Sequence, residues 1–495
     1  MLTRSLGRAL AATATMGLLA AALVTPAAAA TVATTWVAQT SNTTAGLDGV
    51  SFVDCNNGWA AGDSSLVDPA NSQGPSHATI VHTSDGGATW ARQDTPIDGH
   101  IDRIVMLDKM HGWAAGTYFP DNAAGFVLWT SDGGTAWNRD VAIERLFPNQ
   151  IDGLWATDMS HVFVGDTRDA NSGSRILQTS DGGGSTLTGT WSVAFTSDAT
   201  TPLDLEGLHA VDSSHVWAIG ESNMVRLQGG TWSEMSNGVA PWAPVTLSSV
   251  FFFDAMHGWA VGHQNEALYT SDGGTTWTIQ RSGTETDPNN LDVRFYDLEH
   301  GFFAGDNGRI FATSDHGQTW TAETTPSPSN QFEGMSAPNS AKAWAVGSNG
   351  SIVFRKGVPF VSGISPASGP NAGGTQVVVT GCGFTGATGV SFGTRAATTF
   401  TVNSDTQITV DSPPYSGGQQ VTVTNSMGTS AVSAATLFTY IAPTATPSPT
   451  PTPALPKAGF TGAPSQPGNA PYVVLALLIL PVAARLALRR RRRRH

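Results

Sequence analysis

A short block that ends in Thr-Trp recurs along the first 320 residues, and it constrains the fold more than any other feature. A second block, of the form Asp-x-x-His-Gly-Trp-Ala-x-Gly, precedes it by roughly 15 to 25 residues. Repetition of this kind is typical of one supersecondary unit stacked many times. The well-kept copies of the first block are TSDGGATW (Thr83 to Trp90), TSDGGTAW (Thr130 to Trp137), TSDGGTTW (Thr270 to Trp277) and TSDHGQTW (Thr313 to Trp320).

The aromatic residue of the second block marks seven repeats, at successive intervals of 54, 50, 54, 42, 43 and 42 residues. Each repeat contains short apolar runs between clusters of Gly, Asp and Asn, which indicates strands and turns rather than helices. About four strands in a unit of roughly 40–50 residues is the period of a propeller blade. We therefore predict an all-β fold with a seven-bladed β-propeller over residues 31–357. The seven marker residues are Trp59, Trp113, Phe163, Trp217, Trp259, Phe302 and Trp344.

The two ends of the repeat array predict how the ring closes. The seventh repeat stops after Phe354 without a TSDGG block, whereas TTWVAQT, Thr34 to Thr40, matches TTWTIQR, Thr275 to Arg281. We expect the N-terminal strand to complete the last blade, because a closed ring leaves no open sheet edge.

The TSDGGTTW block resembles the Asp-box, or BNR repeat, of sialidases, sortilin-type receptors and photosystem II assembly-factor-like proteins. The resemblance covers roughly residues 32–356 and implies a structural hairpin between the two outer strands of a blade. Its aspartate can accept hydrogen bonds from backbone N–H groups two residues on, and its glycines supply positive φ. The aspartates concerned are Asp85, Asp132, Asp181, Asp272 and Asp315.

Histidine and aspartate are common metal ligands, so the second block suggests a metal site. The repetition of the block argues against such a site. A group found in nearly every blade occupies equivalent, well-separated places, so these side chains cannot converge on one ion. We interpret the block as a turn, and we predict no metal site, no cofactor and no catalytic residues. The residues concerned are Asp54, Asp108, Asp158, Asp212, Asp254 and Asp297, with His111, His161, His215, His257 and His300.

Function is expected where the repeats differ. Blades one to three carry longer loops after the Trp-Ala-x-Gly strand, from Asp63 to Ala78, Thr117 to Gly125 and Asp166 to Ser174. These second-to-third-strand loops should lie on the face opposite the Asp-boxes, where a rigid scaffold can hold binding residues. Our candidate ligand contacts are Tyr118, Phe119, Arg168 and, from a blade connection, Trp242. The alternative interpretation is a set of tolerated surface insertions.

The resemblance to sialidases raises an enzymatic alternative. It implies an arginine triad, a Tyr–Glu nucleophile pair and an acid/base Asp, but tyrosine is scarce in the propeller, at Tyr118, Tyr269 and Tyr296. We predict binding or adhesion through the propeller and keep an extracellular glycoside hydrolase as the alternative. A cluster of Arg, Tyr and Glu on one face would favour that alternative. An assembly factor for a membrane complex is a further alternative, suggested by the repeat resemblance alone.

Residues 358–440 form a second predicted domain of short Val/Thr-rich strands, typical of a β-sandwich. The segment resembles an IPT/TIG domain, an immunoglobulin-like fold. Cys55 and Cys382 lie in different predicted domains, so we expect both to be buried, unpaired small residues. The resemblance rests on Ile364-Ser365-Pro366, Gly373-Gly374-Thr375, Gly383-Phe384, Phe392-Gly393 and Phe438-Thr439-Tyr440.

The ends of the chain predict display at a cell surface. Residues 1–30 are typical of a secretory signal peptide, and residues 441–470 form a Pro/Thr-rich linker. Residues 471–488 are predicted to cross a membrane once, and the Arg-rich residues 489–495 place the tail in the cytoplasm. Within the linker, Leu455, Pro456, Lys457, Ala458 and Gly459 resemble a sortase sorting signal, with Ala458 where that signal has Thr. We leave open cell-wall attachment by a sortase and simple tail anchoring.

The net charge of the predicted exported part limits which kinds of molecule it can bind. Removing Arg4, Arg8 and the seven arginines after Pro471 leaves 16 of the 25 basic residues against 38 acidic ones, a net charge near −22. Such a charge argues against nucleic acid as a partner. The expected partner is an extracellular glycan or protein.

Overall fold

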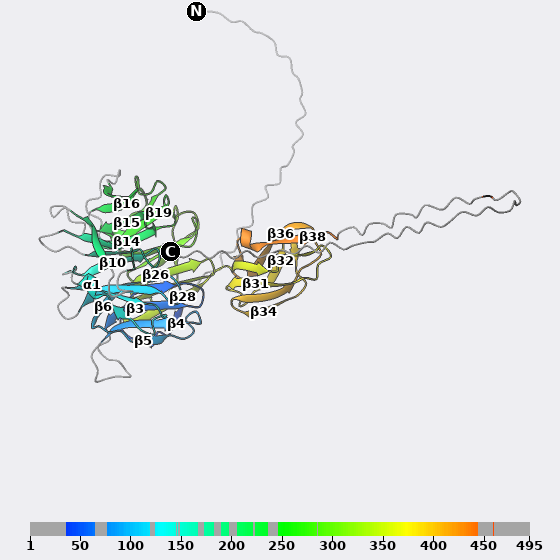
Figure 1. The fold of residues 1–495 in the computed structure, drawn as a ribbon, viewed down its shortest axis with the longest axis horizontal. Helices are drawn as coiled ribbons and strands as arrows, with labels where there is room; N and C mark the ends of the chain where they lie inside the picture. Colours follow the sequence, from blue (N-terminus) through cyan, green and yellow to red (C-terminus); the bar gives the residue numbers. More distant parts are fainter. Residues whose placement is uncertain are drawn as a thin grey trace, which may run out of the picture. The chain divides into compact units, whose positions relative to one another are not determined.

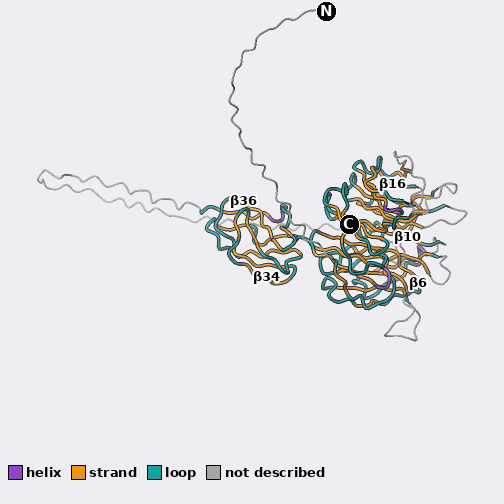
Figure 2. Tube along the Cα trace, turned by 180° about the vertical axis from the view of Figure 1, so that it is seen from behind, coloured by secondary structure: helices purple, strands orange, loops and turns teal. Residues whose placement is uncertain are grey.

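The computed structural model describes residues 36–443, apart from 65–76, 119–123, 145, 147–148, 167–172, 183–189, 198–204, 221–222, 236–245 and 285, and also Gly459. Strands make up most of these residues (Figure 2). The predicted signal peptide, membrane segment and Arg-rich tail lie outside the described residues, as do Leu455 to Ala458 of the sortase-like motif. Among the residues described, no helix is both long and apolar enough to cross a membrane.

Seven four-stranded antiparallel sheets follow one another along the described chain and form the predicted blades (Figure 1). In each of the first six blades the first strand is innermost and the strands run outward in sequence order. The first three blades are β2 (Leu47–Phe52), β3 (Gly58–Ser64), β4 (Ala78–Thr83) and β5 (Ala91–Gln93); β6 (Gly99–Met106), β7 (Gly112–Tyr118), β8 (Gly125–Thr130) and β9 (Asn138–Arg139); and β10 (Ile151–Ala156), β11 (Val162–Asp166), β12 (Arg175–Thr179) and β13 (Trp191–Thr196).

The remaining blades keep the same order, and the short helices join strands. These blades are β14 (Leu205–Asp212), β15 (His215–Gly220), β16 (Met224–Gln228) and β17 (Thr231–Met235); β18 (Leu247–Phe252), β19 (Gly258–Gly262), β20 (Glu266–Thr270) and β21 (Thr278–Arg281); β22 (Asn290–Phe295), β23 (Gly301–Gly305), β24 (Ile310–Thr313) and β25 (Thr321–Glu323); and β26 (Phe332–Asn339), β27 (Lys342–Gly347) and β28 (Ser351–Lys356) with β1 (Val37–Gln39). The helices are α1 (Val141–Glu144), η2 (His263–Asn265), η3 (Ser348–Gly350) and, in the second domain, η4 (Ala434–Thr436).

The N-terminal strand closes the ring as predicted. β1 pairs with β28 in antiparallel register, with Val37 opposite Phe354 and Gln39 opposite Ile352. Trp36 lies just before it, is 3% exposed, and donates a hydrogen bond from its indole N–H to Glu323 at 2.7 Å. The last blade is therefore built from both ends of the repeat array.

The core lies between neighbouring blades, where the repeated aromatic residues stack. The marker Trp259 of blade five lies 3.6 Å from the ring of Phe295 in blade six, with the two planes 12° apart, and Trp217 stacks on Phe252 in the same way. Gly258 precedes the marker because a Cβ there would lie 2.5 Å from the ring of Phe252. The Gly-Trp pair of the repeat is thus an inter-blade packing device.

The second domain is a β-sandwich with its own apolar core. Its first sheet has the order β29-β31-β35-β34, and its second contains β30, β38, β36, β32, β33 and β37. The bounds are β29 (Phe360–Ser365), β30 (Ser368–Pro370), β31 (Gln376–Cys382), β32 (Gly389–Phe392), β33 (Arg395–Ala396), β34 (Phe400–Ser404), β35 (Gln407–Asp411), β36 (Gly417–Asn425), β37 (Gly428–Thr429) and β38 (Leu437–Ile441).

The prediction of two unpaired cysteines is wrong, because Cys55 and Cys382 form a disulfide across 327 residues. Both are buried, as expected. Only three residues separate Lys356, the last residue of blade seven, from Phe360, the first strand residue of the second domain. The disulfide joins this domain to the β2–β3 turn of blade one. An ion pair 2.8 Å long between the buried Lys342 of blade seven and the half-buried Asp405 of the second domain also joins the two domains.

Candidate functional site at one end of the central cavity

The Asp-boxes are structural hairpins between the third and fourth strands of their blades. In the fifth blade Asp272 accepts hydrogen bonds from the Thr276 N–H at 2.8 Å and from the Thr270 hydroxyl at 2.9 Å. The backbone donor lies four residues on, not two as expected, because the side chain spans the whole turn. The same pattern holds at Asp85, Asp132 and Asp315, and at Asp181 the donor is Thr190 because that hairpin is longer.

The Asp-x-x-His residues pair within their own turns. Asp254, for example, accepts hydrogen bonds from the N–H groups of Met256 and His257, and the imidazole of His257 lies 2.9 Å from the same carboxylate. Burial alone would raise the pKa of Asp254, but these hydrogen bonds outweigh it and lower the pKa. Each pair completes a local turn, in keeping with the structural interpretation.

The innermost strands of all seven blades line a central cavity of about 270 Å³. Deep in it, Arg294 donates to Asp292 at 2.7 Å, and Asp292 also accepts from Ser249 and from the N–H of Met335. Burial and then the charge of Arg294 hold the pKa of His209 well below its usual value, so this histidine is neutral. The charge of Arg294 is therefore balanced by Asp292 beside it, and His209 adds no charge.

Five of the seven innermost strands carry an acidic residue at their second repeat position, and two of the five, Asp48 and Glu333, line the central cavity. These residues, which we call the acidic ring, are Asp48, Asp102, Asp152, Glu206 and Glu333. Each follows the first apolar residue of its repeat unit, as in Leu47-Asp48, so the five lie at one level around the propeller axis. Because the innermost strands begin where the second strands end, the ring faces the side from which the long loops of blades one to three depart.

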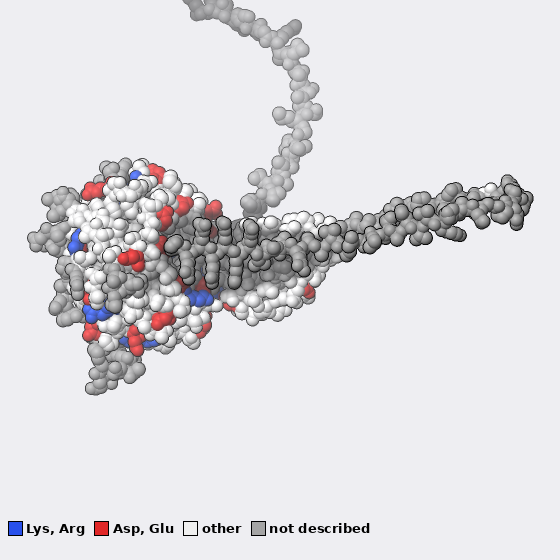
Figure 3. Space-filling model, in the orientation of Figure 1, with Lys and Arg blue, Asp and Glu red and all other residues white. Residues whose placement is uncertain are grey.

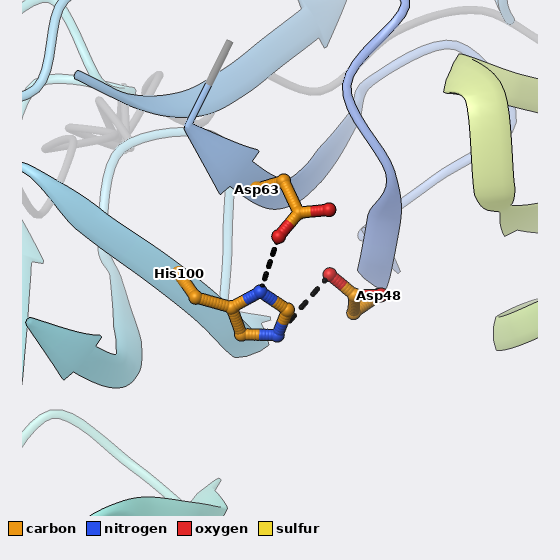
Figure 4. Close-up of side chains that lie close together, drawn as sticks. All are labelled: Asp48, Asp63 and His100. Carbon is orange, nitrogen blue, oxygen red and sulfur yellow. Dashed lines mark hydrogen bonds and ion pairs between the residues drawn. The ribbon is translucent and has the colours of Figure 1, made fainter. Parts of the chain in front are cut away.

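His100 of β6 lies against two members of the acidic ring, Asp48 and Asp102, and against Asp63 of β3; Figure 4 shows it with Asp48 and Asp63. Its Nδ1 lies 2.6 Å from an oxygen of Asp63, at the end of β3. Its Nε2 lies 2.9 Å from Asp102 and 3.4 Å from Asp48. Three blade-one and blade-two strands thus aim three carboxylates at one imidazole.

Burial and mutual repulsion oppose the ionisation of the carboxyl groups in the acidic ring. Burial, followed by the hydrogen bond and charge of Glu333, raises the pKa of Asp48 to about 9. Burial and the charge of Asp102 raise the pKa of Asp152 to about 7. Burial alone would lower the pKa of His100, but the hydrogen bonds to Asp102 and Asp63 raise it to about 11. The ring therefore favours the uptake of positive charge.

Of the four predicted ligand contacts, the structure describes Tyr118. Its hydroxyl donates to Glu144 at 2.6 Å, and its ring packs on Phe126. Arg139 lies over that ring and donates two hydrogen bonds to Glu144, at 2.9 and 2.7 Å. The charges of Arg139 and Glu144 neutralise each other, and the hydrogen bond from Tyr118 holds α1 against the blade. The other three contacts, Phe119, Arg168 and Trp242, lie outside the described residues.

Sequence reasoning missed the acidic ring and His100. A signal was present: Leu47-Asp48, Ile101-Asp102, Ile151-Asp152 and Leu205-Glu206 follow the same intervals as the marker aromatics. The acids of the ring were overlooked because the residues after them differ from blade to blade. The turn aspartates, in contrast, belong to blocks whose sequence is nearly the same in each repeat.

Fold and site define a β-propeller with an acidic central opening, followed by an immunoglobulin-like sandwich. Comparison confirms the predicted resemblance of the second domain, because residues 359–440 match the IPT/TIG domain model. A search of curated proteins found no match to the chain.

Similar solved structures include two YCF48 structures, one described as bound to D1 peptide (19% identity, covering 65% of this chain and 96% of that chain, TM-score 0.49). The other is YCF48 from Cyanidioschyzon merolae (18% identity, covering 65% and 98%, TM-score 0.49). A GH74 enzyme from Niastella koreensis is also similar (12% identity, covering 82% and 69%, TM-score 0.48). At these identities the likeness is one of fold.

Proposed function

We propose that this protein is a binding protein, and that its propeller recognises a protein ligand through basic side chains received at the acidic ring. The observation that carries the proposal is the placement of five carboxyl groups at equivalent positions around the propeller axis, two of which, Asp48 and Glu333, line the central cavity. Repeated acids facing a cavity concentrate the local field, which attracts and orients positive charge. Lysine or arginine side chains are the matching groups on a protein.

The wider surface supports the same class of ligand. On the face that Figure 3 shows, Asp and Glu are more abundant than Lys and Arg. The predicted exported part has a net charge near −22, from 38 acidic residues against the 16 basic ones that remain. A ligand with basic groups would therefore meet an attractive field before it reaches the ring.

We further propose that the propeller and its neighbouring domain are displayed at a cell surface. The support is the sequence: a signal peptide over residues 1–30, a Pro/Thr-rich linker over 441–470 and an apolar segment over 471–488 with a basic tail. Such an order of segments would hold the binding domain outside the cell and away from the membrane.

The test compares probes of different chemistry on the full chain. Binding is measured at physiological salt to an immobilised Lys-rich peptide, to a Glu-rich peptide of equal length and to insoluble polysaccharides. We expect retention on the Lys-rich peptide, weakened by added salt, and none on the Glu-rich peptide. Retention on polysaccharide alone would overturn the choice of a protein ligand in favour of a glycan.

A glycoside hydrolase remains the second candidate, because the structure brings one Tyr, one Glu and one Arg together. Tyr118, Glu144 and Arg139 form that cluster on blade two. The same polysaccharide incubations, assayed for released sugar, test this alternative. Sugar release by the wild type that is lost in Tyr118→Phe would favour the enzyme over the binding protein.

A further inference from the structure

We propose that Arg281 and Arg309, which we call the arginine pair, receive a carboxylate group of the same protein ligand whose basic side chains the acidic ring receives. This inference rests on the proposed function, because it assigns the carboxylate to that ligand. It adds that the ligand carries charges of both signs and binds in one orientation, with its acidic group over blades five and six.

One aromatic ring brings the arginine pair together. Arg281 is the last residue of β21 in blade five, and Arg309 comes directly before β24 in blade six. Their guanidinium carbons lie 4.4 and 4.9 Å from the centre of the Phe311 ring. Phe311 is buried, whereas both arginines are partly exposed. The ring therefore holds two positive charges from neighbouring blades close to each other and within reach of a ligand.

Neither guanidinium group of the arginine pair donates a hydrogen bond to a carboxylate within the described structure. The Arg281 side chain donates to no residue that the structure describes, and its Nε is buried without an acceptor there. Arg309 donates one hydrogen bond, to the side-chain oxygen of Asn265 at 3.1 Å. Burial and the charge of Arg309 lower the pKa of Arg281, and the charge of Asp287 opposes them. A carboxylate bound between the two arginines would reduce their repulsion.

The other arginines of the described propeller each have an oxygen acceptor. Four of them donate to a carboxylate at 2.7 or 2.9 Å, which matches the fit of a planar guanidinium to two carboxylate oxygens. Three more donate to backbone carbonyls. A carboxylate from a ligand would give Arg281 the partner that these arginines have. The four are Arg139, Arg175, Arg294 and Arg355, and the three are Arg92, Arg103 and Arg226.

The arginine pair lies on the same face of the propeller as the acidic ring. β21 ends where β20 begins, with Arg281 opposite Ala267, and β24 begins where β23 ends. The innermost strands of blades five and six begin at the same level, because neighbouring strands in a blade are antiparallel. One ligand on this face can therefore contact both sites.

The acidic ring is interrupted at the two blades that carry the arginine pair. At the repeat position of the ring acids, blades five and six have Ser248 and Leu291. The ring acids lie on blade seven and on blades one to four. A ligand that contacts both sites must place its basic groups over those five blades and its acidic group over the other two. This arrangement of charge selects one orientation of the ligand.

The test compares two Lys-rich peptides that differ only at one end. A flexible Gly/Ser spacer, made in several lengths, joins the Lys-rich part to Glu-Glu or to Gln-Gln, and both C-termini are amidated. The wild-type full chain should bind the Glu-ended peptide about fivefold more tightly at the best spacer length, as a well-placed ion pair at a surface provides. Net charge alone predicts the opposite order, because the chain is acidic and the Gln-ended peptide is the more positive of the two.

Variants show whether the preference for the Glu-ended peptide arises at the arginine pair. The double variant Arg281→Gln, Arg309→Gln should lose the preference and bind the Gln-ended peptide at least as tightly as the wild type does. The charge-matched control is Lys109→Gln, Arg395→Gln, which should keep the wild-type preference. Lys109 lies in the β6–β7 turn on the opposite face of the propeller, and Arg395 lies in the second domain.

Circular dichroism and thermal unfolding show whether each variant is folded. Should the double variant unfold, Arg281→Gln alone takes its place and should also lose the preference, because that side chain has no hydrogen bond in the described structure to lose. Equal binding of the two peptides by the wild type, or a preference that survives in the Gln variant, would overturn this inference and leave the proposed function standing. A wild type that binds neither peptide would overturn both.

Discussion

At the scale of single residues, the chain uses aspartate in two different ways. The turn and Asp-box aspartates are satisfied by hydrogen bonds within a few residues, as Asp272 is by Thr270 and Thr276. The acids of the ring instead face acids of neighbouring blades, as Asp48 faces Glu333. Local hydrogen bonds stabilise the fold, whereas repulsion between the acids of the ring costs stability.

Replacing Asp272 by Ala should destabilise the propeller by about 1–2 kcal/mol, because three hydrogen bonds across one hairpin are lost. Chemical denaturation measures the loss. Asp94→Ala, at an exposed aspartate outside the Asp-boxes, should change the free energy of unfolding by less than about 0.5 kcal/mol. Equal effects of the two variants would contradict the structural role of the Asp-box.

The turn aspartates predict a specific pH dependence. Burial alone would raise the pKa of Asp212, but hydrogen bonds from Ser214 and His215 lower it to about 2. A carboxyl whose folded pKa is lowered stabilises the fold above its unfolded pKa of about 3.9, and this contribution is lost as the pH falls toward 2. Asp212→Asn should therefore be less stable than the wild type at pH 6, and the difference should vanish near pH 2. Unfolding curves across this range measure it, and a difference independent of pH would refute the assignment.

At the scale of elements, the blades could be predicted because one packing device is repeated. An aromatic marker such as Trp259, which stacks on Phe295, recurs once in every blade, and glycine precedes it in blades one, two, five and six, which imposes a visible period on the sequence. The closing strand β1 was predictable for the same reason, since its Thr-Trp pair matches the outer strand of other blades. The acids of the ring recur with the same period, but the residues next to them in the sequence differ from blade to blade. The pattern is therefore visible only when the innermost strands are aligned.

Closure of the ring makes the N-terminal segment important for stability. Deleting residues 31–40 should lower the unfolding temperature strongly, and Trp36→Ala alone should cost about 3–5 kcal/mol because the indole is fully packed. Val37→Ala, on the neighbouring residue that is 56% exposed, should cost less than about 0.5 kcal/mol. A truncated protein that melts like its parent would disprove closure by β1.

At the scale of the whole molecule, the disulfide makes the propeller and the sandwich one covalent unit. Sequence could not predict it, because Cys55 and Cys382 become neighbours only through the seating of one domain on the other. The same holds for the ion pair of Lys342 and Asp405. The contacts of Tyr118 with Glu144 and Arg139 could not be predicted from the sequence either, because they depend on the packing of α1.

Cleavage of the chain between Lys356 and Phe360 tests this covalent unit. The two fragments should remain together on a denaturing gel without reductant and separate when reductant is added. The double variant Cys55→Ser, Cys382→Ser should separate in both conditions and lose about 2–5 kcal/mol of stability. Fragments of the wild type that separate without reductant would show that the disulfide is absent.

The central claim is that ligands are received at the acidic ring, and charge-neutral variants test it most directly. The measurement is the affinity of the full chain for the Lys-rich peptide at pH 8, for the wild type and for the double variant Asp152→Asn, Glu206→Gln. The charge-matched control is Glu234→Gln, Glu299→Gln, at an outer strand and a turn away from the ring. We predict at least a tenfold loss of affinity in the ring variant and wild-type affinity in the control. Equal losses in both variants would show that net charge, rather than the ring, attracts the peptide, and would contradict the account.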